Sequence, residues 1–163
     1  MEWLYLELNN KKLRINKNDS LDIYCWRETK TKPSYWFKMK PTLNIKSDYK
    51  RYIIIINKKG YILSRIVYKA HNKDWDITDS SKNNFIDHIN INSIDNRIEN
   101  LRILTNQQNQ FNTNAKGYCW NKIHNKWHAY IKIDGKTKNL GYFDDQEDAH
   151  ISYLNAKEIY HKI

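Results

Sequence analysis

The sequence predicts an α+β fold: an antiparallel β-rich N-terminal segment, a mixed middle segment, and a C-terminal three-stranded sheet with one helix. Three observations predict it. Apolar residues alternate with polar ones through much of residues 1–62, as in strands. Residues 64–71 have helical spacing instead, and three strand-like segments after residue 116 precede one long helical pattern. Strands grouped ahead of helices are typical of α+β proteins.

In the N-terminal segment, Leu4, Leu6 and Leu8 alternate with polar or amphipathic neighbours, as a half-buried strand requires. A turn is indicated at 57–60 by Asn-Lys-Lys-Gly. The strands expected here are 4–8, 21–26, 35–39, 50–56 and 61–63, and a helix is expected at 64–71.

Charge and composition narrow the classes of function. The formal net charge is +10 and the pI is about 9.5, so the chain attracts polyanions, of which nucleic acid is the most common. The longest apolar run, 52–56, is too short to cross a bilayer, and the N-terminus has no secretion signal. Cys25 and Cys119 lie in unlike contexts, which argues against a disulfide scaffold or a cysteine zinc site. We expect an intracellular protein, in the cytoplasm or in a nucleus or viral factory, that is not secreted.

Residues 85–109 carry the strongest signal. Strands are expected at 85–89 and 101–104 around a polar loop, and Thr105 with Gln108 forms a capping box that begins a helix. Asp87 offers a hard anionic oxygen for Mg²⁺, and Asn109 on the first helical turn offers an amide oxygen. His88 suits a general base near neutral pH, with Asn100 orienting its imidazole. Neighbouring strand residues point to opposite faces, so Asp87 and His88 require a strand end or a twist.

This pattern resembles the Asp-His…Asn…Asn signature of HNH endonucleases, most closely the phage and viral homing type. The phrase Asn-Arg-x-x-Asn-Leu-Arg at 96–102 and the strand-turn-helix at 52–71 are similar to that family too. The resemblance implies a ββα-metal core at 83–112 within a domain at 1–112. It implies Asp87 and Asn109 as metal ligands, His88 as the general base and Asn100 as a structural residue of the site.

The C-terminal segment begins after a linker at 112–116. Strands are expected at 117–121, 126–133 and 136–143, with Asp134-Gly135 as a hairpin turn. Asp144 and Glu147 form a second capping box, which opens a helix to the C-terminus. Its sheet-facing residues are expected to be Ala149, Tyr153, Ala156 and Tyr160.

Residues 116–163 resemble the AP2-type DNA-binding domain, through Gly117-Tyr118, Trp127-x-Ala-x-Ile131, Leu140-Gly-x-Phe143 and the helix. A small sheet can enter the major groove. Lys138 falls on the nominally inner face, which leaves the register of its strand in question. The outer face is expected to carry Cys119 and Thr137 beside the predicted DNA contacts. These contacts are Asn121, Lys122, His128, Tyr130, Lys132 and Asn139, together with Arg97 and Arg102 of the middle segment.

Two alternatives stay open for the N-terminal aromatic residues: a stacking platform for bases, or a small aromatic core. Basic residues around Pro33 similarly either follow a phosphate backbone or solvate a loop. The aromatic residues are Trp3, Tyr24, Trp26, Tyr35, Trp36 and Phe37, and the basic residues are Arg27, Lys30, Lys32, Lys38 and Lys40.

The sequence thus predicts a metal-dependent endonuclease of homing type that acts on double-stranded DNA and nicks one strand per site. One divalent ion is expected, Mg²⁺ or alternatively Mn²⁺. The chain is expected to be a monomer or a weak dimer, without a protein partner. The alternatives are a non-catalytic DNA-binding regulator derived from a nuclease, and a nuclease or binding protein directed to RNA.

Overall fold

The computed structural model describes residues 1–46, 49–81 and 83–162. The chain divides into two compact units, Met1–Ile103 and Leu104–Ile163. Among the described residues, strands outnumber helices, as the α+β prediction requires. The first unit contains β1 Trp3–Leu8, β2 Lys11–Asn16, β3 Asp19–Arg27, β4 Tyr35–Lys38, β5 Thr42–Lys46, β6 Tyr49–Ile56, β7 Lys59–Ile62, α1 Leu63–His71, β8 Phe85–His88, a 3-10 turn Ile98–Asn100 and β9 Leu101–Leu104, whose last residue begins the second unit.

β1 to β4 form one antiparallel sheet in chain order. One face is aliphatic and buried, with Leu8, Leu13, Ile15 and Ile23 in the main core. The other face carries aromatic side chains around one arginine, whose guanidinium carbon lies 4.4 to 4.8 Å from three ring centroids. The core under this sheet is therefore aliphatic. The aromatic face comprises Trp3, Tyr5, Arg14, Tyr24, Trp26 and Trp36.

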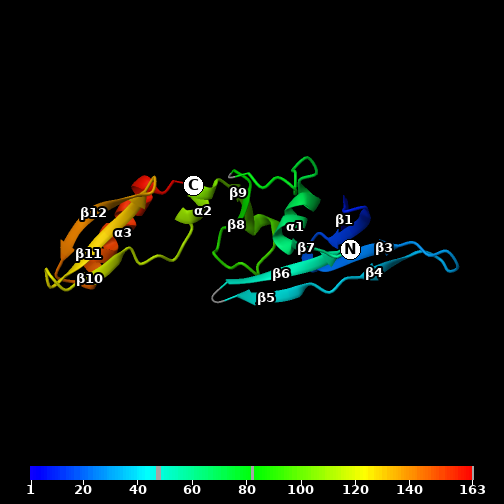
Figure 1. The fold of residues 1–163 in the computed structure, drawn as a ribbon, viewed down its shortest axis with the longest axis horizontal. Coiled ribbons are helices and arrows are strands. Elements are labelled where there is room, and N and C mark those ends of the chain that lie inside the picture. The colour runs from blue at the N-terminus through cyan, green and yellow to red at the C-terminus, as the bar shows by residue number, and fades with distance from the viewer. Residues whose placement is uncertain (47–48, 82, 163) are drawn as a thin grey trace. The chain divides into compact units, whose positions relative to one another are not determined.

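A second antiparallel sheet, β5-β6-β7, leads into α1. Its hairpin turns at Asn57 and Lys58, both with positive φ, as the turn at 57–60 predicted. α1 buries Leu63, Ile66, Val67 and Ala70 and packs against β1, β6 and β7 (Figure 1). The helix and the two sheets thus share one core, which Leu101 of β9 and Ile86 of β8 also join.

The loop between α1 and β8 is held by two polar side chains. Arg65 of α1 donates to the carbonyl oxygens of Ile77 at 2.8 Å and of Asn84 at 3.1 Å. The buried Asn84 side chain donates to the carbonyls of Asp76 and Asp79. Burial lowers the pKa of the Arg65 guanidinium. These bonds fix the start of β8 relative to α1, and so position the segment that carries Asp87.

The second unit contains α2 Asn106–Phe111, β10 Tyr118–Asn121, β11 Lys126–Ile133, β12 Lys136–Phe143 and α3 Gln146–Tyr160. The three strands form one antiparallel sheet, and α3 lies along one face of it (Figure 1). Ala149, Tyr153 and Ala156 are buried against that sheet, as predicted. The end of the helix was expected at the C-terminus, but α3 stops at Tyr160, and Ile163 lies outside the described residues.

Two details of this unit bear on the sequence-based expectations: the start of α3 differs from the prediction, and the position of Lys138 is now established. The N-cap of α3 is Asp145, which accepts from the Glu147 backbone N–H at 2.6 Å, so the capping box expected at Asp144 with Glu147 is wrong and the helix is capped one residue later. Lys138 lies opposite the buried Ile131, and its ammonium donates to the Tyr160 hydroxyl and lies over that ring. A bulge between Ala129 and Tyr130 shifts the register before this pair. The inner position of Lys138 is thus occupied by an amphipathic side chain that covers the helix end.

No helix in the described ranges has both the length and the apolar character needed to span a bilayer.

Candidate active site

The candidate site is built on the two-stranded sheet of β8 and β9, whose bounds fall within one residue of those predicted. β8 ends at His88, because the chain turns at Ile91, which has a positive φ and whose N–H donates to the His88 carbonyl at 2.8 Å. The Ile89 N–H donates to the Asn100 carbonyl at 2.9 Å and closes the loop. The predicted polar loop is therefore a compact turn between two short strands.

Four polar side chains of this segment are buried. The exposed fraction is 7% for Asp87, 9% for His88, 3% for Asn96 and 6% for Asn100. Burying such groups is unfavourable unless hydrogen bonds replace their water contacts. Their burial therefore indicates a specific polar arrangement.

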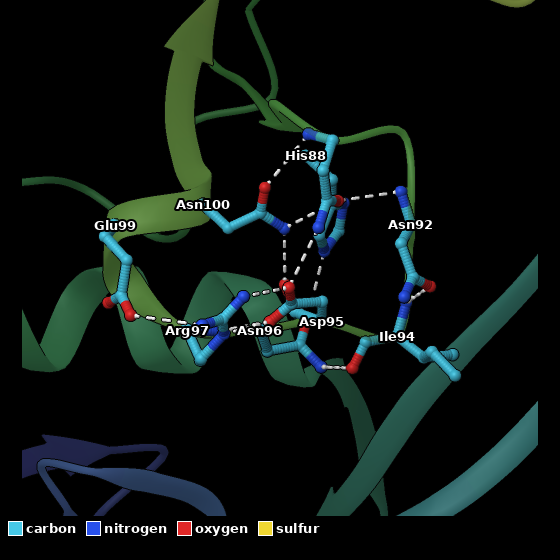
Figure 2. Close-up of polar contacts among 9 residues, drawn as sticks. His88, Asn92, Ile94, Asp95, Asn96, Arg97, Glu99 and Asn100 are labelled. Atoms are coloured by element: carbon cyan, nitrogen blue, oxygen red, sulfur yellow. Dashed lines mark hydrogen bonds and ion pairs between the residues drawn. The ribbon is translucent and has the colours of Figure 1, made fainter.

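Asn100 organises the loop. Its Oδ1 accepts from the Asn90 N–H at 3.0 Å, and its Nδ2 donates to Asn90 Oδ1 at 3.0 Å and to the Asp95 carbonyl at 2.8 Å (Figure 2). The expectation that Asn100 orients the imidazole directly is thus corrected, since its amide is used by the loop backbone. The structural role that the family resemblance implied for this residue agrees with these contacts.

Asn96 is the residue that bonds the imidazole. His88 Nε2 lies 3.2 Å from Asn96 Oδ1, and Asn96 Nδ2 donates to the Ile94 carbonyl at 3.2 Å (Figure 2). Because the amide nitrogen of Asn96 is directed to a carbonyl, its oxygen is directed to His88 and requires a donor. A proton on His88 Nε2 satisfies this contact.

Asp87 has a different neighbour. Its Oδ2 accepts from Arg102 Nε of β9 at 2.9 Å. The two consecutive residues Asp87 and His88 are thus both enclosed, but one contacts the neighbouring strand and the other contacts the loop. The ion pair also assigns an internal contact to Arg102, for which a DNA contact remains a prediction.

Asp95 and Arg97 form an ion pair at the surface of the loop. Asp95 accepts from Arg97 Nε at 2.8 Å and Nη2 at 2.7 Å, and from Asn90 Nδ2 at 2.9 Å. The Arg97 hydrogen bond is the main reason that the pKa of the Asp95 carboxyl is lowered, against the opposing effect of burial. Arg97 is itself exposed on its other side, so its predicted DNA contact is compatible with this ion pair.

The last predicted ligand, Asn109, belongs to the second unit. The capping box is present as predicted, with Thr105 Oγ1 accepting from the Gln108 N–H at 3.1 Å, and α2 begins at Asn106. The Asn109 N–H donates to the Thr105 carbonyl at 3.0 Å, which places Asn109 on the first turn. Its amide is half-buried.

The donor chemistry can be tested against a divalent ion. Within the described ranges, His, Cys, Asp and Glu side chains form no group of three or more suited to hold a metal. One buried carboxylate and a neutral amide are hard oxygen donors that suit a magnesium ion retaining several waters. The chemistry of Asp87 and Asn109 thus fits Mg²⁺, although Arg102 already neutralises part of the Asp87 charge.

The predicted DNA contacts of the second unit lie in two places, on the outer face of the sheet and in the turn after β10. His128 stacks on Tyr142 at 4.7 Å and lies 3.1 Å from Asn139 Oδ1 through Nε2. Tyr130 and Lys132 lie opposite Asn139 and Thr137, so they share the face as predicted. Asn121, by contrast, caps the following turn, where its Oδ1 accepts from the N–H groups of residues 123 and 124, while Lys122 is exposed in that turn.

Asn96 was missed in the sequence because an asparagine in a polar loop has no distinguishing pattern. Only its burial and its contact with His88 separate it from its neighbours. The available signal was its place in the Asn-Arg-x-x-Asn-Leu-Arg phrase, of which it is the first residue.

Residues 61–111 match a family model described as HNH endonuclease. The matched segment runs from β7 through α1 and the hairpin to the last residue of α2. No curated protein and no solved structure matches the chain. The match confirms the resemblance to HNH nucleases for this segment, which is less than half of the chain. It supports a nuclease, and therefore a hydrolase with a nucleic acid substrate.

Proposed function

We propose that the chain is a metal-dependent DNA endonuclease in which His88 is the general base. The observation that carries the proposal is the buried His88–Asn96 contact within the segment that matches the HNH family. Any buried imidazole N–H needs an acceptor, so the match to the HNH family is what favours a base over a structural histidine. For a base the bond has a further use, because it determines which nitrogen takes the proton.

In the proposed reaction, the His88 imidazole takes a proton from a water molecule as the water oxygen forms a bond to phosphorus. The bond from phosphorus to the 3′ oxygen breaks on the opposite side and leaves a 5′ phosphate, and the 3′ oxygen takes a proton from solvent to become a hydroxyl. Asn96 keeps the imidazole ring oriented during this step, and Asn100 keeps the loop that carries Asn96 closed. Asp87 and Asn109 would hold a divalent ion, Mg²⁺ or alternatively Mn²⁺, which would supply positive charge against the scissile phosphate.

The finer parts of the proposal follow from the sequence resemblances. The nuclease region is taken to extend to residue 112, so that it includes both proposed ligands, and residues 116–163 are taken as an AP2-like module for double-stranded DNA. His128, Tyr130, Lys132, Asn139, Asn121 and Lys122 are its proposed contacts, joined by Arg97 and Arg102. One site per chain cuts one strand, so a monomer or weak dimer of homing type is expected to nick.

The test is nicking of supercoiled plasmid with Mg²⁺ or Mn²⁺. We expect nicks that disappear in His88→Ala while DNA binding persists, since the base contributes about 10²–10⁴ to the rate. A wild-type chain that binds DNA but never nicks with either ion would contradict catalysis and favour a non-catalytic DNA-binding protein. Cleavage restricted to RNA would instead favour a nuclease directed to RNA.

A further inference from the structure

The first unit has a groove that the nuclease hairpin does not use. It lies between the aliphatic side of the first sheet and β6, and its volume is about 690 Å³, within the range of ligand sites. The groove floor includes the buried Ile54 and Ile56 of β6 and the half-buried Met39. The lining therefore has an apolar part.

Positively charged side chains also line the groove. Lys11 of β2, Arg27 of β3 and Lys40 line the groove, and Glu28 is the one acidic residue among the described residues of its lining. The excess of basic over acidic residues extends beyond the groove. Residues 1–60 contain 14 Lys and Arg against 6 Asp and Glu, whereas residues 104–163 contain 8 Lys and Arg against 6 Asp and Glu. Residues 1–60 thus hold most of the net positive charge of the chain.

Flat π surfaces complete the lining. Tyr35 and Phe37 on β4 are 46% and 40% exposed, and the Arg27 guanidinium carbon lies 3.7 Å from the centroid of the Phe37 ring. Rings and stacked guanidinium groups are the surfaces on which unpaired bases pack, while lysines bind the phosphates between them. The aromatic face on the other side of the sheet differs, since its rings pack on one another around Arg14 and lie beside Glu7 and Asp22.

We propose that this groove binds a nucleic acid strand, with phosphates on Lys11, Arg27 and Lys40 and an unpaired base against Phe37 and Tyr35. A strand is favoured over a free nucleotide because the basic residues continue beyond the groove. Lys30 and Lys32 lie in the β3–β4 connection, and Lys58 and Lys59 at the β6–β7 turn. The site provides binding energy and performs no chemistry.

Fluorescence anisotropy with labelled oligo(dT) tests the phosphate contacts, measured on the full chain in the His88→Ala background. Binding alone is measured, so the result does not depend on whether the chain cleaves DNA. The variant Lys11→Ala/Arg27→Ala is compared with Lys12→Ala/Lys17→Ala, whose two lysines do not line the groove. Both lose two charges, but Lys11 and Lys12 are consecutive on β2 and only Lys11 lines the groove.

We expect the groove variant to bind more weakly, and the slope of log K against log salt to fall by about 0.7 for each phosphate that is no longer neutralised. The control is expected to change less on both measures. Equal reductions in the two variants would overturn the proposal, because the charge would then act without a site. Thermal unfolding of each variant checks that both remain folded.

A second comparison tests the stacked base. Phe37→Leu keeps an apolar side chain but removes the ring, and Tyr49→Leu removes an exposed ring of β6 that does not line the groove. We expect Phe37→Leu to weaken oligo(dT) binding about fivefold or more, and to leave the binding of an abasic oligonucleotide unchanged. An equal effect on both oligonucleotides, or binding of free dTMP that does not compete with oligo(dT), would refute the stacking of a strand.

Discussion

Replacing Asn96 by alanine tests whether the loop orients the base. The variant removes the acceptor 3.2 Å from His88 Nε2 and leaves a buried donor without that partner. Such a change costs about 1–3 kcal/mol. If the cost appears in the transition state, the nicking rate falls about 5- to 150-fold, since each 1.36 kcal/mol is a factor of ten. The fall should stay below that of His88→Ala, which removes the whole base.

Single-turnover nicking gives the rate, and a DNA titration separates it from affinity. We expect a lower rate with unchanged affinity, because Asn96 is 3% exposed. Asn92→Ala is the matched control, since Asn92 is an exposed asparagine of the same loop whose amide accepts a long bond from the Ile94 N–H.

Nitrogen-15 NMR of His88 gives a readout that a purely structural role would not change. The wild-type imidazole should carry its proton on Nε2, and Asn96→Ala should yield a mixture of the two tautomers. A wild-type proton on Nδ1, or a variant that nicks at the wild-type rate, would refute the reasoning.

Three further predictions concern neighbouring parts of the chain. Arg102→Gln removes the cation at Asp87, and a bond to a charged group contributes about 1.5–3 kcal/mol. Half-maximal nicking should therefore need roughly tenfold less Mg²⁺. An unchanged Mg²⁺ requirement would argue against Asp87 as a ligand. The pKa of Asp95 is lowered by folding, so its contribution to stability is present above the unfolded pKa of about 3.9 and is lost as pH falls through the folded value. In urea unfolding, the stability lost through Asp95→Asn relative to wild type should accordingly be smaller below pH about 4 than above it. Gly117→Ala should destabilise the second unit by more than about 2 kcal/mol in denaturant melts, because its Cβ would overlap an aromatic ring of α3 at a positive φ; Gly135→Ala, also at positive φ but with open space around it, isolates the backbone cost.

Local patterns predicted most elements of this fold because each rests on short-range physics, but they missed the strands β2 and β5. Strand bounds at 126–133 and 136–143 follow from alternation and from the Asp-Gly turn between them. The start of α2 follows from the capping box at Thr105, which involves residues three apart. The one-residue error at α3 arose because two consecutive aspartates, 144 and 145, offer the same capping chemistry.

The site was predicted less completely because its contacts depend on tertiary structure. Asn100 and Asn96 are both loop asparagines, and the sequence does not distinguish the one that bonds the imidazole from the one that holds the backbone. Arg102 was expected to contact DNA, and its bond to Asp87 depends on the pairing of β8 with β9. The side chain that completes a site is thus set by strand pairing and loop closure, which single-residue patterns do not encode.

The distribution of charge bears on how affinity and selectivity are divided. Most of the affinity of a protein for nucleic acid comes from phosphate neutralisation, which scales with the number of cations that bind phosphates. The C-terminal face carries polar and aromatic groups in contact with one another, with His128 stacked on Tyr142 and bonded to Asn139, and its unit has a small positive surplus. Such groups suit contacts with base edges better than strong electrostatic binding. If the groove of the first unit supplies the phosphate contacts, removing its cations should reduce affinity for all sequences alike, whereas changing Asn139 should alter the preference among them.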